Sequence, residues 1–246
     1  MQTPFEPLPE RTAHVWLVEP ERIVDGALLA EYEALLSAAE RERRARFRSA
    51  RLRHDFLIAR ALVRTTLARY TGVDPRALTF DVGAHGRPDL AAVHGSTVSF
   101  NLSHTRGLIA CALVDGHAVG VDVEDRERKT KTSEVAERFF STKEVAALRA
   151  LPASQQQARF FEYWTLKEAY IKARGMGLAI PLGHFSFEVD APGGITIAFD
   201  PALDDDPGRW QFMQRWLTPR HSIALAISRT GDDVAVDLRR GLPPAP

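Results

Sequence analysis

The sequence contains a single cysteine, Cys111, among 246 residues, so the chain cannot form an internal disulfide or a cysteine zinc cage. It has no apolar run long enough to span a bilayer, and its N-terminal residues lack the basic and apolar regions of a signal peptide. We therefore expect a protein of the cytoplasm that does not enter a membrane.

An excess of either charge is also missing. The 32 Lys and Arg residues balance 32 Asp and Glu residues, so no overall field favours nucleic acid or an anionic membrane. Neither a P-loop nor a G-x-G-x-x-G motif follows a predicted strand, which argues against a nucleoside triphosphatase or a dinucleotide-binding domain. The arginine-dense segment 41–53 is therefore interpreted as a solvated helical face or a site for a small anionic ligand.

Hydrophobic periodicity predicts helices first and strands second, and this order occurs twice. The predicted helices are 25–36, a segment opened by the capping box Ser37–Glu40, 51–70, and 155–173. Shorter helices are expected to start near Ser133 and at the capping pattern Ser141-Thr-Lys-Glu144. The predicted strands are 13–19, 78–82, 97–103, 107–114, 118–124, 184–190, 194–200, 209–217, 221–228 and 233–238. The dipeptide Asp115-Gly116 predicts a hairpin turn between strands 107–114 and 118–124.

These elements predict an α+β protein made of two similar α+β halves, each with an antiparallel sheet packed on a long helix. We assign residues 1–116 to an N-terminal half and 117–240 to a C-terminal half. The residues 241–246 (GLPPAP) are expected to form a flexible tail, because their prolines and glycine do not suit regular structure.

The segment Gly120-Val-Asp-Val-Glu124 places Asp122 and Glu124 two residues apart on a predicted strand, so both carboxylates share one face. Oxygen ligands at this spacing suit Mg²⁺, which shares its coordination shell with substrate phosphates. Taken alone, this pattern is more typical of a solvated strand surface.

A second candidate lies in the long helix 155–173. Glu168 and Lys172 are four residues apart and share a face, with Trp164 one turn earlier and Lys167 adjacent. An isolated pair of this kind is usually an ordinary surface ion pair. The many aromatic residues around it, however, predict a buried helix on which such charges need a partner.

A third group combines the turn Gly83–Pro88 with the strand end Phe100-Asn-Leu-Ser-His104. Arg87 can bind a phosphate through two nitrogens, and Ser103 and His104 offer a hydroxyl and an imidazole. A serine hydrolase triad is disfavoured, because neighbouring side chains on a strand point to opposite faces and no G-x-S-x-G motif is present.

Taken together, HGRP, FNLSH, GVDVE, RFFSTKE and FFEYWTLKEAYIKARGMGL resemble the 4′-phosphopantetheinyl transferases of the surfactin-synthetase-activating type. The resemblance covers residues 40 to 190 with matching order and spacing. It implies a monomer with pseudo-twofold symmetry between its halves, with coenzyme A and Mg²⁺ bound at their interface.

The resemblance also implies roles for individual residues. Asp122, Glu124 and Glu168 would hold the metal, and Glu168 and Lys172 would be the catalytic residues. The coenzyme A contacts would come from Arg43, Arg87, Ser103, His104, Lys167 and Lys172. Two positions depart from the pattern: Arg87 stands where many members have lysine, and Glu40 where some do.

The implied reaction transfers 4′-phosphopantetheine from coenzyme A to a serine of an apo acyl or peptidyl carrier protein, with release of 3′,5′-ADP. Two alternatives are a non-catalytic module of the same fold that binds coenzyme A or a carrier protein, and a different Mg²⁺-dependent nucleotide enzyme. The three acidic residues argue against the first alternative, and the missing nucleotide-binding motifs argue against the second. The motifs do not distinguish fatty-acid, polyketide and peptide carriers.

Overall fold

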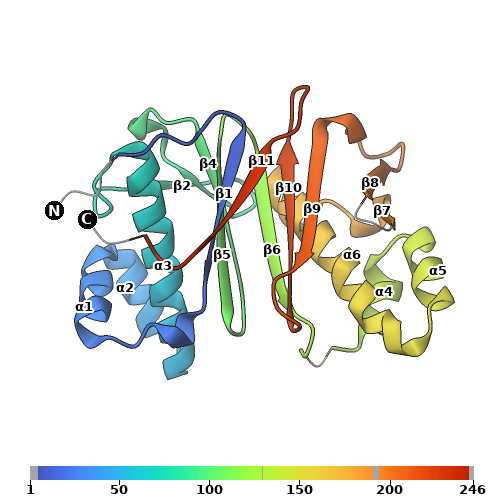
Figure 1. The fold of residues 1–246 in the computed structure, drawn as a ribbon, viewed down its shortest axis with the longest axis horizontal. Helices are drawn as coiled ribbons and strands as arrows, with labels where there is room; N and C mark the ends of the chain where they lie inside the picture. The colour runs from blue at the N-terminus through green and yellow to red at the C-terminus, as the bar shows by residue number, and fades with distance from the viewer. Residues whose placement is uncertain (1–4, 129, 191–193, 244–246) are drawn as a thin grey trace. The chain divides into compact units, whose positions relative to one another are not determined.

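The computed structural model describes residues 5–128, 130–190 and 194–243. The chain divides into two compact units. Unit 1 comprises Met1–Val82, Pro88–Gly116 and Ala235–Pro246, and unit 2 comprises Gly83–Arg87 and His117–Val234. Each unit combines a 22-residue helix with antiparallel strands (Figure 1), which confirms the predicted α+β class with its two α+β halves.

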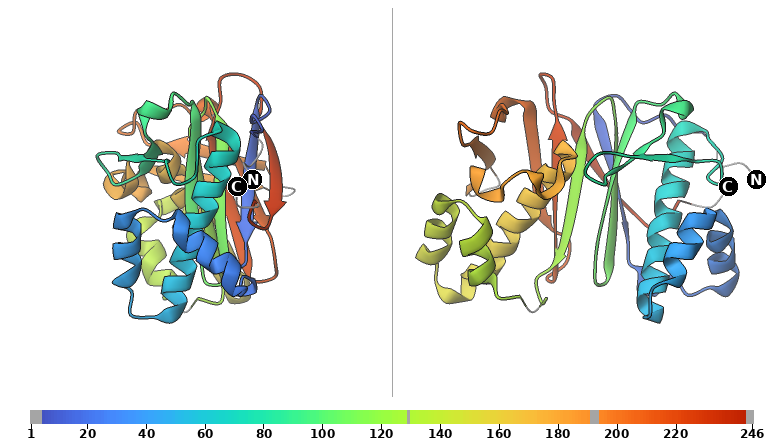
Figure 2. Two further views of the ribbon diagram at one scale, coloured as in Figure 1. Left: turned by 90° about the vertical axis from the view of Figure 1, so that its left-hand side faces the viewer. Right: turned by 180° about the vertical axis from the view of Figure 1, so that it is seen from behind.

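Unit 1 is built on a four-stranded sheet in the order β11-β1-β5-β4. Its strands are β1 (Thr12–Val18), β4 (Val98–Thr105), β5 (Leu108–Asp115) and β11 (Ala235–Arg240), and β2 (Phe80–Val82) and β3 (Pro88–Leu90) form a separate hairpin. The helices are α1 (Gly26–Leu35), α2 (Ala38–Ala45) and α3 (Ala50–Thr71), and α1 and α2 lie beside α3 (Figures 1 and 2).

The helix α3 supplies much of the core of unit 1. The Ser49 side chain accepts a hydrogen bond from Leu52 N at its start, and Gly72, with a φ of 71°, ends it in the left-handed conformation that favours glycine. Apolar residues along its length, including Ile58 and Leu62, are fully buried. The predicted helix 51–70 and the capping box at Ser37 are both confirmed.

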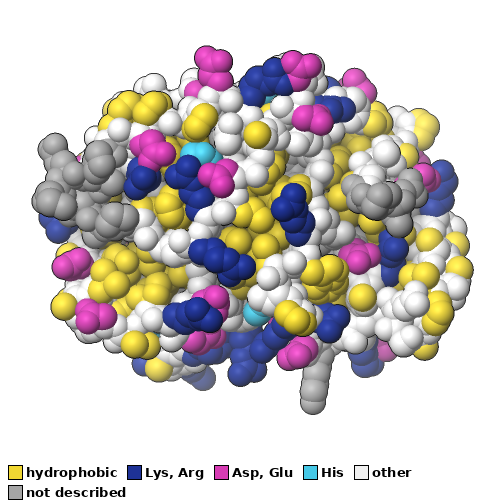
Figure 3. Space-filling model, in the orientation of Figure 1, with side chains coloured by type: hydrophobic (Ala, Val, Ile, Leu, Met, Phe, Trp, Pro, Cys, Tyr) yellow, Lys and Arg dark blue, Asp and Glu magenta, His cyan; other side chains and the backbone are white. Residues whose placement is uncertain are grey.

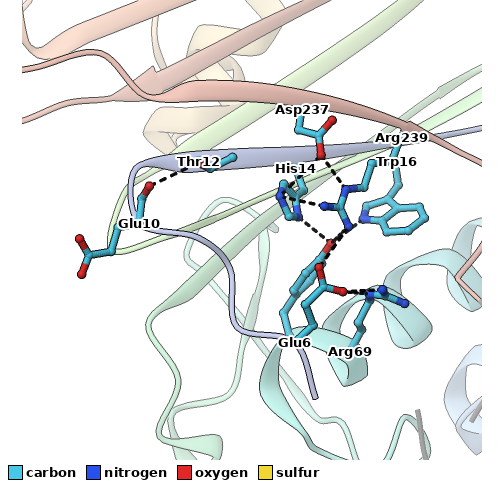
Figure 4. Close-up of polar contacts among 9 residues, drawn as sticks. Glu6, Glu10, Thr12, His14, Trp16, Arg69, Asp237 and Arg239 are labelled. Carbon is cyan, nitrogen blue, oxygen red and sulfur yellow. Dashed lines mark hydrogen bonds and ion pairs between the residues drawn. The ribbon is translucent and has the colours of Figure 1, made fainter. Parts of the chain in front are cut away.

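The C-terminal strand β11 belongs to unit 1, whereas we predicted it in the C-terminal half. It pairs with β1 in parallel, and a polar network fastens it there (Figure 4). The Arg239 guanidinium donates to the Tyr70 hydroxyl at 3.3 Å and lies over the Trp16 ring, and His14 Nδ1 is 2.7 Å from the same hydroxyl. Burial and the Arg239 charge lower the pKa of His14, which favours the neutral imidazole in this network.

The predicted tail also begins inside unit 1. Gly241 N donates to Leu17 O at 3.0 Å, and Leu242 packs against the core. Residues 244–246 lie outside the described residues.

The predicted hairpin at Asp115-Gly116 is wrong. The strand before it, β5, pairs with β1 and β4, and the strand after it, β6 (Val119–Asp125), pairs with β10. Gly116 does adopt a positive φ of 68°, so the turn is real. It joins strands of two different sheets because each strand finds its partner elsewhere in the chain.

Unit 2 contains a three-stranded antiparallel sheet in the order β6-β10-β9 and a separate hairpin of β7 and β8. Its further strands are β7 (Phe185–Asp190), β8 (Gly194–Phe199), β9 (Trp210–Trp216) and β10 (His221–Ser228), and its helices are α4 (Thr132–Phe139), α5 (Thr142–Ala150) and α6 (Ala153–Arg174). The helix α6 packs on β6 and β10, and Gly175, with a φ of 67°, ends it. The predicted helix 155–173 and the strands after it are confirmed, with the last of them in unit 1.

On the face drawn in Figure 3, basic and acidic side chains are interspersed. This pattern agrees with the equal numbers of both charges in the sequence. Among the described residues, none of the helices combines the length and the apolar character needed to cross a membrane.

Candidate functional site

The strand β6 and the helix α6 approach each other closely at Gly120. A Cβ atom built on Gly120 would lie 2.0 Å from Ala169 O and 2.5 Å from Ala173 N, so only a hydrogen atom fits between the two backbones. Because side chains alternate along a strand, Asp122 and Glu124 lie on the same face of β6 as Gly120 and point toward α6. The glycine therefore brings the two acids of the strand against the acid and the lysine of the helix.

An ion pair connects the two elements. Lys172 Nζ donates to Asp122 Oδ1 at 2.6 Å and to Val121 O at 3.2 Å. The Asp122 side chain is 7% exposed and that of Lys172 is 26% exposed, so the carboxylate is almost enclosed while the lysine side chain is partly open to solvent. A negatively charged ligand at this point would therefore meet the Lys172 ammonium.

The other two carboxylates have raised pKa values. Burial, and after it the Asp122 charge, raise the pKa of Glu124 to about 7, even though Arg128 donates to it at 3.2 Å. Burial and the Asp122 charge also raise the pKa of Glu168. Within the described chain, no hydrogen bond or ion pair reaches the Glu168 carboxylate. Three acids thus share a poorly solvated region with one lysine, an arrangement that a positively charged ligand would relieve.

The donor set consists of oxygen atoms, the kind that a hard divalent cation such as Mg²⁺ prefers. Among the residues that the structure describes, no group of three or more His, Cys, Asp or Glu side chains is placed to hold a metal ion. Asp122, Glu124 and Glu168, which we predicted as metal ligands, supply oxygen atoms of this kind, and their role as ligands stays a prediction.

Lys167 does not lie with these residues. Its side chain is fully buried, and Nζ contacts Glu144 Oε2 at 2.8 Å and donates to the Leu182 and Phe185 carbonyl oxygens at 2.7 Å each. The ammonium also lies 4.2 Å from the centre of the Phe185 ring. Burial lowers the pKa of Lys167 to about 8, with the Glu144 charge opposing that effect. The predicted coenzyme A contact does not fit this enclosed position, because a phosphate cannot reach it.

Glu144 is a residue that we predicted only as a helix cap. Its Oε2 accepts from Ser141 N at 2.9 Å, which confirms the predicted capping box, and its Oε1 accepts from Phe187 N at 3.0 Å. The carboxylate therefore joins the start of α5, the strand β7 and the buried Lys167. The burial of Lys167 could have been predicted from the sequence, since Phe160, Tyr163 and Lys167 recur at helical spacing on one apolar stripe.

Arg87 lies at the end of α6, in the turn that belongs to unit 2. Its Nη1 donates to Ala173 O at 3.0 Å and to Lys172 O at 3.3 Å, both carbonyls of the last helical turn. A cation at this end also interacts favourably with the helix dipole. Arg87 is thereby fixed to the helix that contributes Glu168 and Lys172.

The remaining predicted residues are in unit 1. Ser103 and His104 are successive residues of β4, with Ser103 buried and His104 exposed, as expected for neighbours on opposite faces of a strand. Arg43 is exposed on α2, and its guanidinium carbon lies 5.9 Å from the centre of the Phe56 ring.

Comparisons with known proteins agree with the motifs. A family model described as the 4′-phosphopantetheinyl transferase superfamily matches residues 118–227, and one described as 4′-phosphopantetheinyl transferase, N-terminal, matches residues 27–114. The chain is 37% identical over 164 residues to a 4′-phosphopantetheinyl transferase of Bacillus subtilis, covering 67% of this chain and 71% of that protein.

Other relatives give similar values. The 4′-phosphopantetheinyl transferase HetI of Nostoc sp. is 37% identical over 170 residues, covering 68% of this chain and 70% of its own. The transferase Sfp of Bacillus subtilis strain 168 is 32% identical over 169 residues, covering 68% and 72%. A solved holo-[acyl-carrier-protein] synthase of Thermotoga maritima aligns with 45% of this chain and 62% of its own, at a TM-score of 0.36 and 23% identity.

The fold and the acidic site therefore belong to a group-transfer enzyme. The chain is a member of the 4′-phosphopantetheinyl transferase family, which confirms the resemblance and the enzyme class that the motifs predict. The roles of individual residues stay predictions.

Proposed function

We propose that this protein transfers the 4′-phosphopantetheine group of coenzyme A to a serine hydroxyl of an apo carrier protein and releases 3′,5′-ADP. The observation that supports this most is the meeting of Asp122, Glu168 and Lys172 where β6 contacts α6, in a chain of the phosphopantetheinyl transferase family. The similarity to proteins named 4′-phosphopantetheinyl transferases supports this transfer. A pure coenzyme A or carrier-protein binder would not need an acidic group of this kind.

In the proposed reaction, the serine oxygen attacks the phosphorus atom on the pantetheine side of the pyrophosphate. A new P–O bond to serine forms, the P–O bond to the bridging oxygen breaks, and 3′,5′-ADP leaves with the electron pair. Glu168 is the candidate base for the serine proton, because its carboxylate lies close to Asp122 and Lys172 in the acidic site. The Lys172 ammonium offsets charge that develops on the leaving group.

We further propose that Asp122, Glu124 and Glu168 hold Mg²⁺. The ion would supply charge neutralisation for the pyrophosphate. The raised pKa values of Glu124 and Glu168 support this assignment, because a divalent cation would return both groups to the ionised form. Arg43, Arg87, Ser103 and His104 remain our candidates for contacts to coenzyme A.

The equal charge totals and the single, buried cysteine support a protein that works in the reducing cytoplasm without nucleic acid. We propose a monomer as the working form and an acyl or peptidyl carrier protein as the partner.

The test of the function is intact-mass spectrometry of apo carrier proteins incubated with this protein, coenzyme A and Mg²⁺, beside a reaction containing EDTA. We expect a mass gain of one phosphopantetheine group only in the reaction with metal. Coenzyme A binding without any mass gain on fatty-acid, polyketide or peptide carriers would favour the non-catalytic module instead.

The contacts of Lys167 support a structural role, and they make a separate prediction. Lys167→Met leaves the Glu144 charge buried without its partner, and breaking a buried pair in this way costs about 3–5 kcal/mol. For a chain of this size, we expect the melting temperature to fall by roughly 6–20 °C in differential scanning calorimetry. At a temperature where the variant is still folded, its KM for coenzyme A should equal that of the parent protein.

The matched control is Lys143→Met, the same substitution at an exposed lysine of α5. It should melt within about 1–2 °C of the parent, as surface substitutions usually do. If Lys167→Met kept the melting temperature and raised the KM for coenzyme A, the phosphate contact predicted from the motifs would be restored.

A further inference from the structure

Unit 1 contains a cavity that shares no residue with the proposed reaction. Its volume is about 420 Å³, within the range of roughly 300–1,000 Å³ that is typical of small-molecule sites. It lies where the end of β1, the short 3₁₀ helix η1 (Pro20–Arg22), α1, the start of β5 and the residues after β11 meet. The described residues that line it include neither the predicted metal ligands nor the predicted coenzyme A contacts. The cavity is therefore a separate candidate site.

The walls of the cavity are largely apolar. Leu17 and Leu108 are buried in them, and Ile23, Leu28 and Leu242 are partly buried and pack on the core of unit 1. The last three side chains keep apolar surface that a ligand can cover. Because the removal of apolar surface from water is favourable, the cavity suits a ligand with an apolar body.

Tyr32, from α1, adds a polar group to these walls. The residue is only 3% exposed, and among the described residues no hydrogen bond or ion pair reaches its hydroxyl. Buried tyrosine hydroxyls usually have a hydrogen-bond partner. Burial, and after it the Glu31 charge, raise the pKa of Tyr32, so the hydroxyl keeps its proton at neutral pH. Tyr32 can therefore donate a hydrogen bond to an oxygen atom of a ligand in the cavity.

The charged residues that line the cavity have one positive charge in excess. Arg22 Nε lies 2.8 Å from Glu19 Oε2, and Arg240 Nη1 lies 3.9 Å from Glu19 Oε1, so two guanidinium groups share one carboxylate. The side chains of Arg22 and Arg240 are 79% and 62% exposed, which places them at the opening toward solvent. The opening therefore favours an anion, and a single excess charge matches a carboxylate better than a phosphate dianion.

We propose that this cavity binds an aliphatic carboxylate, with its chain against the apolar walls and its carboxylate near Arg22 and Arg240. The Tyr32 hydroxyl and the two guanidinium groups supply donors for its oxygen atoms. The ligand would contact β1, α1 and the segment after β11 together, so its binding should also hold the end of the chain in place. The proposal is independent of the transfer reaction, because it uses other residues and another ligand.

Isothermal titration calorimetry tests the ligand class with octanoate, octanol, octylamine and acetate, each below the concentration at which it forms micelles. Octanol and octylamine keep the chain with a neutral or a positive head, and acetate keeps the carboxylate without the chain. We expect octanoate to bind at least about tenfold more tightly than each of the others, the effect of one hydrogen bond to a charged group. Equal binding of octanol would overturn the choice of an anion, and equal binding of acetate would overturn the role of the apolar walls. A failure of octanoate to bind would overturn the site itself.

Two variants locate the ligand in the cavity. Tyr32→Phe removes only the hydroxyl, and we expect the Kd for octanoate to rise about 2- to 10-fold, the effect of one hydrogen bond. Its melting temperature without ligand should stay the same or rise, because the hydroxyl has no partner within the described chain. Arg240→Gln should raise the Kd for octanoate and leave the Kd for octanol unchanged, since octanol carries no charge.

The matched controls are Tyr163→Phe and Arg149→Gln, the same substitutions at residues of unit 2 that do not line the cavity. Both should bind octanoate as the parent protein does. An unchanged Kd in Tyr32→Phe would place the ligand outside the cavity, and a lower melting temperature of that variant without ligand would show that the hydroxyl is structural. Either result would overturn the proposal. Failure of the proposed transfer reaction would leave all of these measurements unaffected, because none of them uses coenzyme A.

Discussion

Glu168→Gln is expected to lower the transfer rate by about 10²- to 10⁴-fold, the loss that follows when several kcal/mol of charge stabilisation or the candidate base is removed. The melting temperature should stay the same or rise. Burial raises the pKa of Glu168, so the folded protein disfavours its ionised form at neutral pH, and no hydrogen bond reaches this carboxylate within the described chain. A neutral amide of the same shape removes that cost.

The sign of the stability effect follows from linkage. A carboxyl whose pKa is higher in the folded than in the unfolded protein lowers stability once the pH rises above the unfolded value. The parent protein therefore carries this cost at neutral pH and Glu168→Gln does not. The measurement is mass-spectrometric transfer to a carrier protein, paired with calorimetry on the same samples.

Two companion variants sharpen the result. Asp122→Asn should also abolish transfer, but it should melt lower than the parent because Lys172 Nζ loses the charged partner that it contacts at 2.6 Å. Glu162→Gln, a partly exposed acid on the same helix that pairs with Arg159, should retain transfer. Normal turnover in Glu168→Gln would remove this residue from the reaction, and a loss of activity accompanied by a lower melting temperature would indicate a structural role.

The sequence predicted the helices and strands well because their signals are local. The capping boxes at Ser37 and Ser141 form as predicted, and the long helices end at Gly72 and Gly175, where a left-handed residue stops them. The alternation in GVDVE likewise placed Asp122 and Glu124 on one face of a strand. Each of these features depends only on residues within a few positions of one another.

The partners of the strands were harder to predict. Asp115-Gly116 looks like a hairpin turn, yet the strands on either side belong to different sheets. The strand β11 pairs in parallel with β1. The paired residues Thr12 and Ala235 lie more than 200 positions apart in the sequence. Hydrophobic period shows that a segment is a strand, but the choice of neighbour depends on packing across the whole unit.

Only part of the site was predicted correctly, because neighbours in the sequence need not be neighbours in the fold. Lys167 and Glu168 are adjacent in the sequence and were given neighbouring roles, but successive residues of a helix point in directions about 100° apart. Lys167 therefore lies within the aromatic core, whereas Glu168 lies near Asp122.

The second large effect is expected at Gly120, where β6 and α6 touch. In Gly120→Ala the new methyl group would lie 2.0 Å from Ala169 O and 2.5 Å from Ala173 N, far inside van der Waals contact. Both atoms belong to the backbone of α6, so no side chain can turn aside and the whole helix must move. Overpacking of this kind costs about 1–3 kcal/mol and occasionally more, and we expect the upper end or beyond.

For a chain of this length, that cost corresponds to a melting temperature lower by roughly 6–12 °C, measured by calorimetry. The transfer rate should fall as well, at a temperature where circular dichroism shows the variant still folded. A helix displaced from β6 moves Glu168 and Lys172 away from Asp122, and a displacement of about 1 Å in an active site can cost about 10²-fold in rate.

The matched control is Gly183→Ala, also in unit 2, where a new Cβ would be 3.7 Å from the nearest backbone oxygen, an ordinary contact. That variant should keep both its melting temperature and its transfer rate. If Gly120→Ala behaved in the same way, β6 and α6 could separate without consequence, and the reaction would not depend on the close approach of the strand acids to the helix. If Gly120→Ala lost activity and stability together while Gly183→Ala lost neither, the glycine of G-x-D-x-E would be required because the backbone of α6 leaves no room for a side chain there. This close approach sets the distance between Asp122 and the residues of the helix.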